Sequence, residues 1–290
     1  MRIAVFTDAE GAGLGLVDDD EIAVMTRDDP GAALLGLIEA GAAGLADART
    51  QAAGAARVAL GSVRLGPPVV SHQRPVICVG KNYRAHAEEF HGSGFDSTGK
   101  AAIPEHPVIF AKLGSSLIGQ GAPIRSGMDP TGTVDYEGEL AVVIGRRAHK
   151  VSKAAAQEVI FGYTLCNDVT SRVLQQTHNQ WLIGKSLDSF CPLGPWIVPA
   201  GEVPDVTALE LVTTVNGEER QRAALCDLIF DIPALIETLS ATMTLYPGDI
   251  IATGTPAGVG IGFDPPRYLR PGDRVAVTVP GIGTLTNPVA

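Results

Sequence analysis

The chain has 290 residues, of which 45% are hydrophobic, enough for one large domain or for a large domain with a small companion. Its 32 acidic and 22 basic side chains give a net charge of −10. This balance argues against a nucleic-acid partner, because phosphates require a basic surface. No run approaches the about 18 uninterrupted apolar residues of a membrane span, and the N-terminus lacks the apolar core of a signal peptide. We therefore expect a cytoplasmic protein without a membrane partner.

Residues 1–70 are expected to form a small N-terminal α/β domain. Short strand-like runs at Arg2–Phe6, Leu14–Val17 and Glu21–Val24 are separated by turns that contain Asp or Gly. A helix is predicted from Pro30 to about Ala40, where apolar residues recur at helical spacing.

Residues 71–290 are expected to form a second, β-dominated domain. The pattern predicts strands at 76–79, 108–113, 140–144 and 161–166, and a hairpin over 209–217 whose Asn-Gly pair favours a type I′ turn. Two Pro-Gly-Asp turns, at 247–249 and 271–273, each precede a further apolar strand. The chain is therefore an α+β protein of barrel or roll type rather than a doubly wound fold.

Helices in this second region are predicted from their capping residues. Asn82 is expected to cap a helix over 83–90, Ser152 one over 153–159, and Asp231 an amphipathic helix whose apolar face includes Met243. A helical turn is predicted over 170–176. The four cysteines form no Cys-x-x-Cys pair and are interpreted as small core residues: Cys78, Cys166, Cys191 and Cys226.

Three carboxylates are the most informative feature. Glu137 and Glu139 stand at i and i+2, and residues so spaced on a strand face the same side. If Asp168 joins them, each pair of charges repels by about 4 kcal/mol at roughly 4 Å and an effective dielectric of about 20. A divalent cation that prefers oxygen ligands (Mg²⁺, Mn²⁺ or Ca²⁺) would neutralise them. The alternative is a solvated face of an edge strand.

His86 and Glu89 stand three residues apart on the predicted 83–90 helix and share a face. A carboxylate beside an imidazole fixes its tautomer and makes it a base that can activate water. An ordinary surface pair has the same spacing. Arg172 and Gln175 are likewise three apart, after Asp168.

Lys185 follows an apolar run and a glycine, so we expect it to be half-buried, either paired with an acid or catalytic. A glycine-rich loop over 252–260 can offer backbone N–H groups to an anion, although it matches neither a P-loop nor a dinucleotide fingerprint.

In this order the motifs resemble the fumarylacetoacetate hydrolase family, and the resemblance runs from about residue 75 to the end of the chain. The residues that carry it are Gly80–His86, Asp135–Leu140, Gly162–Arg172, Gly184–Ser186, Gly254–Gly260, Gly283–Leu285 and Asn287. The likeness is to a shorter bacterial branch that includes acylpyruvate hydrolases, oxaloacetate decarboxylases and isomerases.

The resemblance implies a mixed β-sandwich roll and a homodimer. It implies Glu137, Glu139 and Asp168 as ligands of Mg²⁺, Mn²⁺ or Ca²⁺, with His86 and Glu89 as the water-activating pair. It makes Lys185 the active-site lysine and the segment His91–Pro104 a lid. The remaining matched residues would contact the substrate: Arg172, Gln175, Thr255 and Lys112.

The leading hypothesis from the sequence is metal-assisted hydrolysis of a C–C bond in a 2,4-dioxo acid. The metal would stabilise the departing enolate, and water activated by His86 would attack the distal carbonyl. The first rival is decarboxylation or isomerisation of oxaloacetate-like or 2-hydroxy-dienedioate acids through the same enolate. The second rival is a ligand-binding module without activity.

Overall fold

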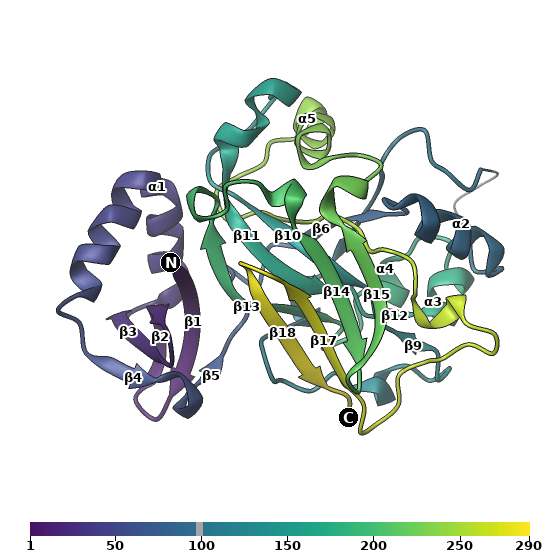
Figure 1. Cartoon of the computed structure of the whole chain (residues 1–290), viewed down its shortest axis with the longest axis horizontal. Coiled ribbons are helices and arrows are strands. Elements are labelled where there is room, and N and C mark those ends of the chain that lie inside the picture. Colours follow the sequence, from purple (N-terminus) through teal and green to yellow (C-terminus); the bar gives the residue numbers. More distant parts are fainter. Residues whose placement is uncertain (97–100) are drawn as a thin grey trace.

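Strands dominate the computed structural model, which describes residues 1–96 and 101–290 (Figure 1). Within these residues the strands form a twelve-stranded sheet, a four-stranded sheet and a two-stranded sheet. The predicted β-dominated α+β class is confirmed.

The N-terminal module lies on the left in Figure 1 and holds one long helix against antiparallel strands. Leu34, Leu37 and Ile38 of the helix are buried against the strands. The elements are β1 (Arg2–Asp8), β2 (Gly11–Asp18), β3 (Glu21–Thr26), α1 (Pro30–Ala52), β4 (Arg57–Ala59) and β5 (Arg64–Leu65).

Helix α1 extends beyond the predicted Ala40, but its backbone leaves helical geometry at Gly41 (φ 56°, ψ −133°). The expected helix is therefore its first segment. By length and composition α1 is long and apolar enough to cross a membrane. Leu34, Leu37 and Ile38 pack it on β2 and β3, and 22% of its apolar window is buried.

Strand β1 pairs with β13 (Cys191–Pro199) at Ile3 and Ile197, so the strands of the N-terminal module continue the large sheet of the rest of the chain. The order across that sheet is β4-β3-β2-β1-β13-β11-β10-β16-β6-β7, with β5 and β8 attached beside it. A domain boundary near residue 70 stays a prediction.

The second region carries the other strands of the large sheet and the two smaller sheets. Its strands are β6 (Val76–Gly80), β7 (Val108–Lys112), β8 (Leu117–Ile118), β9 (Val134–Asp135), β10 (Gly138–Ile144), β11 (Ile160–Asn167), β12 (Thr170–Ser171), β14 (Glu210–Val215), β15 (Glu218–Ala224), β16 (Ile250–Ala252), β17 (Arg274–Val279) and β18 (Gly283–Pro288). Its α-helices are α2 (Arg84–Gly92), α3 (Arg172–Thr177), α4 (Leu182–Lys185) and α5 (Ile232–Thr242).

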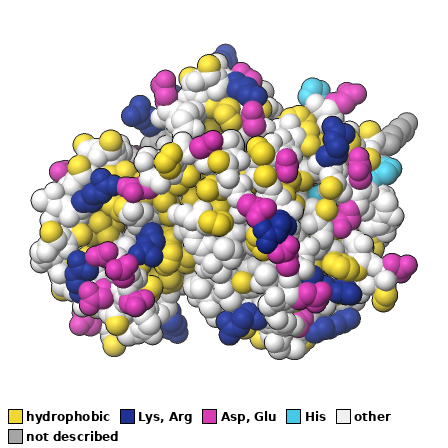
Figure 2. All heavy atoms as spheres, in the orientation of Figure 1, with side chains coloured by type: hydrophobic (Ala, Val, Ile, Leu, Met, Phe, Trp, Pro, Cys, Tyr) yellow, Lys and Arg dark blue, Asp and Glu magenta, His cyan; other side chains and the backbone are white. Residues whose placement is uncertain are grey.

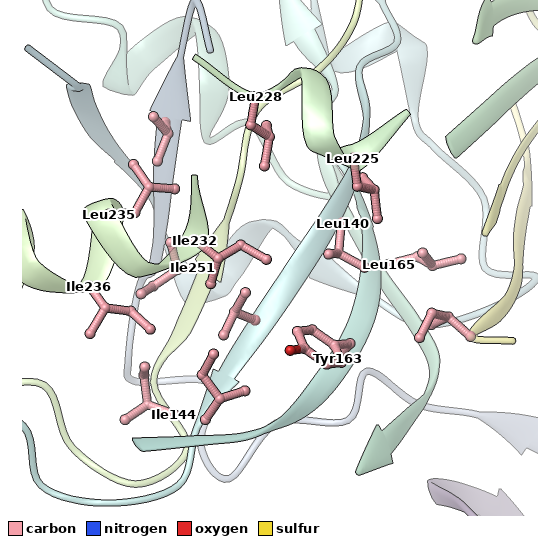
Figure 3. Close-up of a cluster of buried hydrophobic side chains, with 14 of the residues drawn as sticks. Leu140, Ile144, Tyr163, Leu165, Leu225, Leu228, Ile232, Leu235, Ile236 and Ile251 are labelled. Carbon is pink, nitrogen blue, oxygen red and sulfur yellow. The ribbon is translucent and has the colours of Figure 1, made fainter. Parts of the chain in front are cut away.

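The largest core lies between strands β10 and β11 and helix α5, as Figure 3 shows. Leu140 and Leu165 from the two strands are fully buried, and Leu235 and Ile236 of α5 pack into the same cluster. Seven consecutive residues of β10 are buried, because the strand pairs with β11 on one side and β16 on the other. Pairing on both sides holds β10 in place, and with it the residues where the strand begins.

The turn chemistry predicted from the sequence is confirmed. Asn216 and Gly217 both have positive φ (55° and 82°) in the β14–β15 hairpin. Gly248 and Gly272 take positive φ in the two Pro-Gly-Asp turns that precede β16 and β17.

Two of the three predicted helix caps are wrong. Asp231 accepts from the Ala234 N–H and caps α5 as expected. Ser152 makes no side-chain capping bond, and the segment that follows it, Lys153–Val159, is a 3₁₀-helix. Asn82 instead bonds to distant backbone: its amide donates to the carbonyls of Phe230 (3.0 Å) and Thr253 (2.8 Å), and its oxygen accepts from the Phe230 N–H (2.8 Å).

Two burial predictions are also wrong. Met243 is 42% exposed, because α5 ends one residue earlier at Thr242. Cys226 is exposed, whereas the other three cysteines are buried as expected.

On the face shown in Figure 2, Lys and Arg side chains are interspersed with Asp and Glu rather than gathered into a basic patch. Surface pairs such as Arg222 with Glu219 contribute to this mixture. The absence of a nucleic-acid partner and the homodimer stay predictions.

We expect Asn82→Ala to lower the free energy of unfolding by about 2–4 kcal/mol, because buried backbone groups would lose their only described side-chain partner at about 1–3 kcal/mol each. Urea unfolding followed by circular dichroism measures this loss. The exposed Gln51→Ala is the matched control and should change stability by less than about 0.5 kcal/mol. An equal effect of both variants would contradict the bridging role of Asn82.

Candidate active site

Three carboxylates meet where β10 and β11 pair. The antiparallel register matches Gly138 with Asn167, so the start of β10 lies beside the end of β11. Glu137, Glu139 and Asp168 are all buried, and each offers an oxygen within 4.8 Å of the others. The structure therefore brings together the carboxylates singled out from the sequence. Their role as metal ligands stays a prediction.

Two buried lysines neutralise part of this charge. Lys185 Nζ lies 2.9 Å from Glu137 and 2.6 Å from Asp168. Lys112 Nζ lies 2.6 Å from the other oxygen of Asp168. Lys185 is almost fully buried rather than half-buried. The salt-bridged alternative for Lys185 is therefore present, and the lysine also lines the pocket described below.

Arg172 at the start of α3 adds a third cation. Its guanidinium lies 2.6 Å from Glu137 and 2.9 Å from Asp135, and it donates to the Gln175 amide oxygen at 3.3 Å. Arg172 and Gln175 share a helix face, as their spacing predicts. Burial alone would raise the pKa of Glu137, but Lys185 and Arg172 outweigh it and hold that pKa well below its usual range.

Glu139 differs from its neighbours. Among residues 1–96 and 101–290, no lysine or arginine forms an ion pair with it, and its carboxylate accepts from the Gly254 N–H at 2.8 Å. Burial, followed by the charges of Asp168 and Glu137, raises the pKa of Glu139 well above its usual range. Glu139 is thus the carboxylate whose charge the protein leaves least compensated.

The donor set fits a hard divalent cation. Four buried carboxylates, the triad and Asp135, face three buried cations, which leaves one net negative charge. Carboxylate oxygens are the ligands that Mg²⁺, Mn²⁺ and Ca²⁺ prefer. A divalent ion would reverse the net charge of the cluster to positive, which suits an anionic substrate.

His86 and Glu89 lie on helix α2, and His86 Nδ1 is 3.3 Å from Glu89 Oε2. His86 is 4% exposed, so the pair is not an ordinary surface pair. The Glu89 carboxylate also accepts from the Gly258 N–H at 3.0 Å. This arrangement favours an imidazole with its proton on Nδ1 and a free lone pair on Nε2.

Two residues expected to contact substrate have their polar atoms committed to the protein. Lys112 donates to Asp168, Val169 and Lys185, which accounts for all three of its N–H groups. The Thr255 hydroxyl donates to the Gly138 carbonyl at 2.9 Å and accepts from Gln221 at 2.7 Å. Direct contact of either residue with substrate stays a prediction, but the geometry favours positioning roles.

The glycine-rich loop does bind anions with its backbone, and those anions belong to the chain itself. The Gly254 N–H donates to Glu139 and the Gly258 N–H to Glu89. The N–H groups of Gly260 and Ile261 donate to Asp135 at 2.6 and 3.1 Å. The sequence predicted an anion-binding loop without indicating which anions it holds.

Comparison with known proteins shows the family to which the chain belongs. The model of the fumarylacetoacetate (FAA) hydrolase C-terminal family matches residues 75–290. This chain belongs to the fumarylacetoacetate hydrolase family. The resemblance inferred from the motifs is confirmed, and the family's enzymes include hydrolases, isomerases and a tautomerase.

Three relatives indicate the range of reactions in the fumarylacetoacetate hydrolase family. An oxaloacetate tautomerase of Bacillus subtilis is 49% identical over 230 residues, which are 79% of this chain and 74% of that protein. The solved fumarylacetoacetate hydrolase of Exiguobacterium antarcticum has a TM-score of 0.84 and 38% identity, covering 100% of this chain and 99% of the other. A maleylpyruvate hydrolase of Sphingobium sp. SYK-6, solved with manganese(II) and pyruvate, has a TM-score of 0.80 and 33% identity at the same coverage.

In this family member His86 and Glu137 line one small pocket, whose volume is about 10 Å³. The pocket is lined by Gly80, Lys81, His86, Phe90, Glu137, Arg172, Gln175, Trp181 and Lys185. Lys81 and Trp181 were not predicted from the sequence. The one local signal for Lys81 is its place after Gly80 at the end of a strand, and its positive φ of 57° is visible only in the structure.

The segment implied as a lid, His91–Pro104, reaches the pocket at its described ends, while residues 97–100 lie outside the described residues. Asp96 pairs with Lys81 at 2.7 Å. Gln176 of α3 donates to the Gly94 carbonyl at 2.8 Å. The lid role stays a prediction.

We expect Mn²⁺ to raise the melting temperature more at about pH 8 than at about pH 5.5. The raised pKa of Glu139 means that the metal-free fold holds a proton that the unfolded chain releases. The stability that this proton supplies is present at low pH and is lost as pH rises toward the raised value. A bound cation replaces the proton, so its benefit grows with pH. Differential scanning calorimetry checks this, and a shift that is equal or larger at low pH would contradict it.

We expect Glu139→Gln to stabilise the metal-free protein by about 1–3 kcal/mol near neutral pH, because the fold no longer has to take up a proton on a buried carboxyl whose pKa is raised. The amide carbonyl of the introduced side chain can still accept from Gly254. The same variant should lose the thermal shift caused by Mn²⁺. The exposed Glu88→Gln on α2 is the control and should change neither quantity. A full metal-induced shift in Glu139→Gln would remove Glu139 from the ligand set.

Proposed function

We propose that this chain catalyses the keto–enol tautomerisation of a short 2-oxo dicarboxylic acid of the oxaloacetate class, with a divalent metal as cofactor. The observation that carries the proposal is the buried His86, which lines the same small pocket as Glu137 of the acidic triad and lies 3.3 Å from Glu89. A positioned base beside a site for a chelating 2-oxo acid is what proton transfer next to a carbonyl requires.

In this proposal Nε2 of His86 removes the proton from C3 of the keto acid, and a proton is delivered to the carbonyl oxygen. One C–H bond breaks and one O–H bond forms, so no other reactant is consumed. Glu89 orients the imidazole and stabilises its protonated form. A divalent ion held by Glu137, Glu139 and Asp168 would supply the Lewis acid that polarises the 2-oxo group.

Cationic side chains that line the pocket would also stabilise the negative charge that develops on the substrate. Lys185 and Arg172 line the pocket beside Glu137, so their charge would stabilise the enolate oxygen as it develops. Lys81 lines the same pocket, and its ammonium group is paired with Asp96 at 2.7 Å. Together with a divalent ion, Lys185 and Arg172 favour an anionic substrate over a neutral one.

One comparison supports tautomerisation over the hydrolysis favoured by the sequence. The relative that is 49% identical to this chain is an oxaloacetate tautomerase.

The second candidate is hydrolysis of a C–C bond in a 2,4-dioxo acid. The Exiguobacterium and Sphingobium relatives are hydrolases and cover nearly the whole chain, and the same His86–Glu89 pair can activate water. Oxaloacetate decarboxylation would use the same enolate and is separated by its product.

We expect His86→Ala to lower kcat for oxaloacetate enolisation by about 10²–10⁴-fold, because a positioned base contributes that much. Mn²⁺ affinity, measured by isothermal titration calorimetry, should stay within about twofold, since His86 is not in the acidic triad. The exposed His149→Ala is the control and should keep full activity. Full turnover by His86→Ala would contradict the assignment of the base.

One set of assays separates the candidate reactions. The Mn²⁺-loaded protein is mixed with oxaloacetate and with acetylpyruvate. Loss of the enol absorbance without pyruvate formation supports tautomerisation. Pyruvate from oxaloacetate indicates decarboxylation, and pyruvate with acetate from acetylpyruvate indicates hydrolysis. Binding without turnover of any acid would favour the ligand-binding alternative.

A further inference from the structure

The Glu89 carboxylate of α2 lies in a recess formed by the loop Gly258–Gly262, called its seat below. Both carboxylate oxygens face the Gly258 N–H, at 3.0 and 3.2 Å, while one of them faces His86. Glu89 therefore links a helix to a loop far away in the sequence. No lysine or arginine in the described parts of the chain forms an ion pair with Glu89, so the Gly258 N–H is the donor that fixes its far side.

On its opposite side the Glu89 carboxylate lies against Gly262, which has no side chain to occupy that space. A Cβ built on Gly262 would overlap the Glu89 carboxylate and lie 2.8 Å from its Cγ. Gly262 belongs to the 3₁₀-helix η8 (Gly260–Gly262), whose backbone an alanine also adopts. The space beside Gly262, rather than its backbone conformation, is what requires glycine there.

The loop that forms this seat is itself fixed at several points. Gly258 has φ of 100°, and a Cβ there would overlap the Arg220 carbonyl. The Tyr136 hydroxyl donates to the Gly258 carbonyl at 2.8 Å. Gly260 donates to Asp135 at 2.6 Å. The loop therefore holds its position without help from Glu89.

Through Asp135 the loop is also tied to the acidic triad. Asp135 accepts from Arg172, and Arg172 contacts Glu137. His86 and Glu89 lie on α2, whereas the triad carboxylates lie where β10 begins and β11 ends. The loop bonds directly to Glu89 and to Asp135, and Asp135 connects it to the triad through Arg172.

We propose that the loop Gly258–Gly262 is the positioning element of the site, which holds Glu89, and through it His86, in register with the acidic triad. The inference rests on the proposed role of His86 as the base. Gly258 acts through its N–H, and Gly262 acts by leaving the carboxylate room. Neither residue touches the reacting atoms.

The test is Gly262→Ala. Since the overlapping atoms are the far end of a flexible side chain, the fold accommodates the methyl group by displacing Glu89. We expect kcat to fall about 10²-fold, as misplacement of a catalytic group by about 1 Å does. KM and Mn²⁺ affinity should stay within about twofold. The control is Gly201→Ala, in the equally short 3₁₀-helix Ala200–Glu202, where a Cβ meets nothing within 4 Å.

A double-mutant cycle with Glu89→Ala shows whether the effect passes through Glu89. In the Glu89→Ala background, Gly262→Ala should lower kcat by less than about twofold, because the side chain it displaces is gone. A full 10²-fold loss in that background, or no loss in the wild-type background, overturns the proposal. If Gly262→Ala alone does not fold, folding of the double variant supports the contact, and failure of both overturns it.

A second readout is independent of the reaction. In ¹⁵N-glycine-labelled protein, the Gly258 amide resonance should move in the same direction in Glu89→Ala and in Gly262→Ala, because both remove the carboxylate from that N–H. Gly201→Ala should leave it in place. An unmoved resonance in Gly262→Ala overturns the proposal even if the protein turns over none of the acids. Absence of turnover with the expected resonance shifts would instead count against the proposed function alone.

Discussion

The site depends on the pairing of buried carboxylates with buried donors at the end of the β10–β11 ladder. The ladder places Glu137, Glu139 and Asp168 together in the protein interior. Removing carboxylates from water costs several kcal/mol each unless charges or N–H groups compensate. Lys112, Lys185 and the neighbouring arginine supply most of that compensation. Glu139 has no lysine or arginine partner among the described residues, so the cluster favours a proton or a cation at that carboxylate.

The glycine-rich loop compensates buried carboxylates with backbone N–H groups instead of cationic side chains. Its N–H groups at Gly254, Gly258, Gly260 and Ile261 all point at carboxylates of the chain. Backbone donors neutralise a carboxylate without adding a flexible side chain, so they fix its position as well as its charge. A Cβ at Gly260 or Gly262 would overlap a carboxylate oxygen, whereas at Gly254 and Gly258 a positive φ and neighbouring atoms of Asn82 and Arg220 require glycine.

The acidic triad could be predicted from sequence because the chemistry and the period-2 spacing of Glu137 and Glu139 agree with the strand that follows them. The hairpin at Asn216 and the cap at Asp231 were predictable for a similar reason, since both are satisfied within a few residues. Asn82 was not, because its three partners lie about 150 to 170 residues away, at Phe230 and Thr253. A local capping preference of about 1 kcal/mol is easily outweighed by such a set of buried bonds.

Hydrogen-bond partners that are distant in sequence also explain why the roles of individual polar groups could not be assigned from motifs. Lys112 and Thr255 belong to the family pattern, yet each directs its hydrogen bonds to the protein. The distinction depends on which atoms are already paired, and only coordinates contain it. His86 and Lys185 were placed in the site by the family resemblance, because their spacing and expected burial alone left a surface pair and a salt bridge as alternatives.

The choice between proton transfer and hydrolysis depends on water at His86. Both reactions use one enolate, and hydrolysis additionally needs a water held between the base and the distal carbonyl. Phe90 stacks on His86 at 6.1 Å between ring centroids, and Trp181 packs edge-on against Phe90 at 5.9 Å. Phe90 therefore covers one face of the imidazole, while Lys81, Arg172 and Gln175 line the same pocket and offer polar groups to a water or to a substrate. The reaction depends on which of the two these groups hold beside Nε2 of His86.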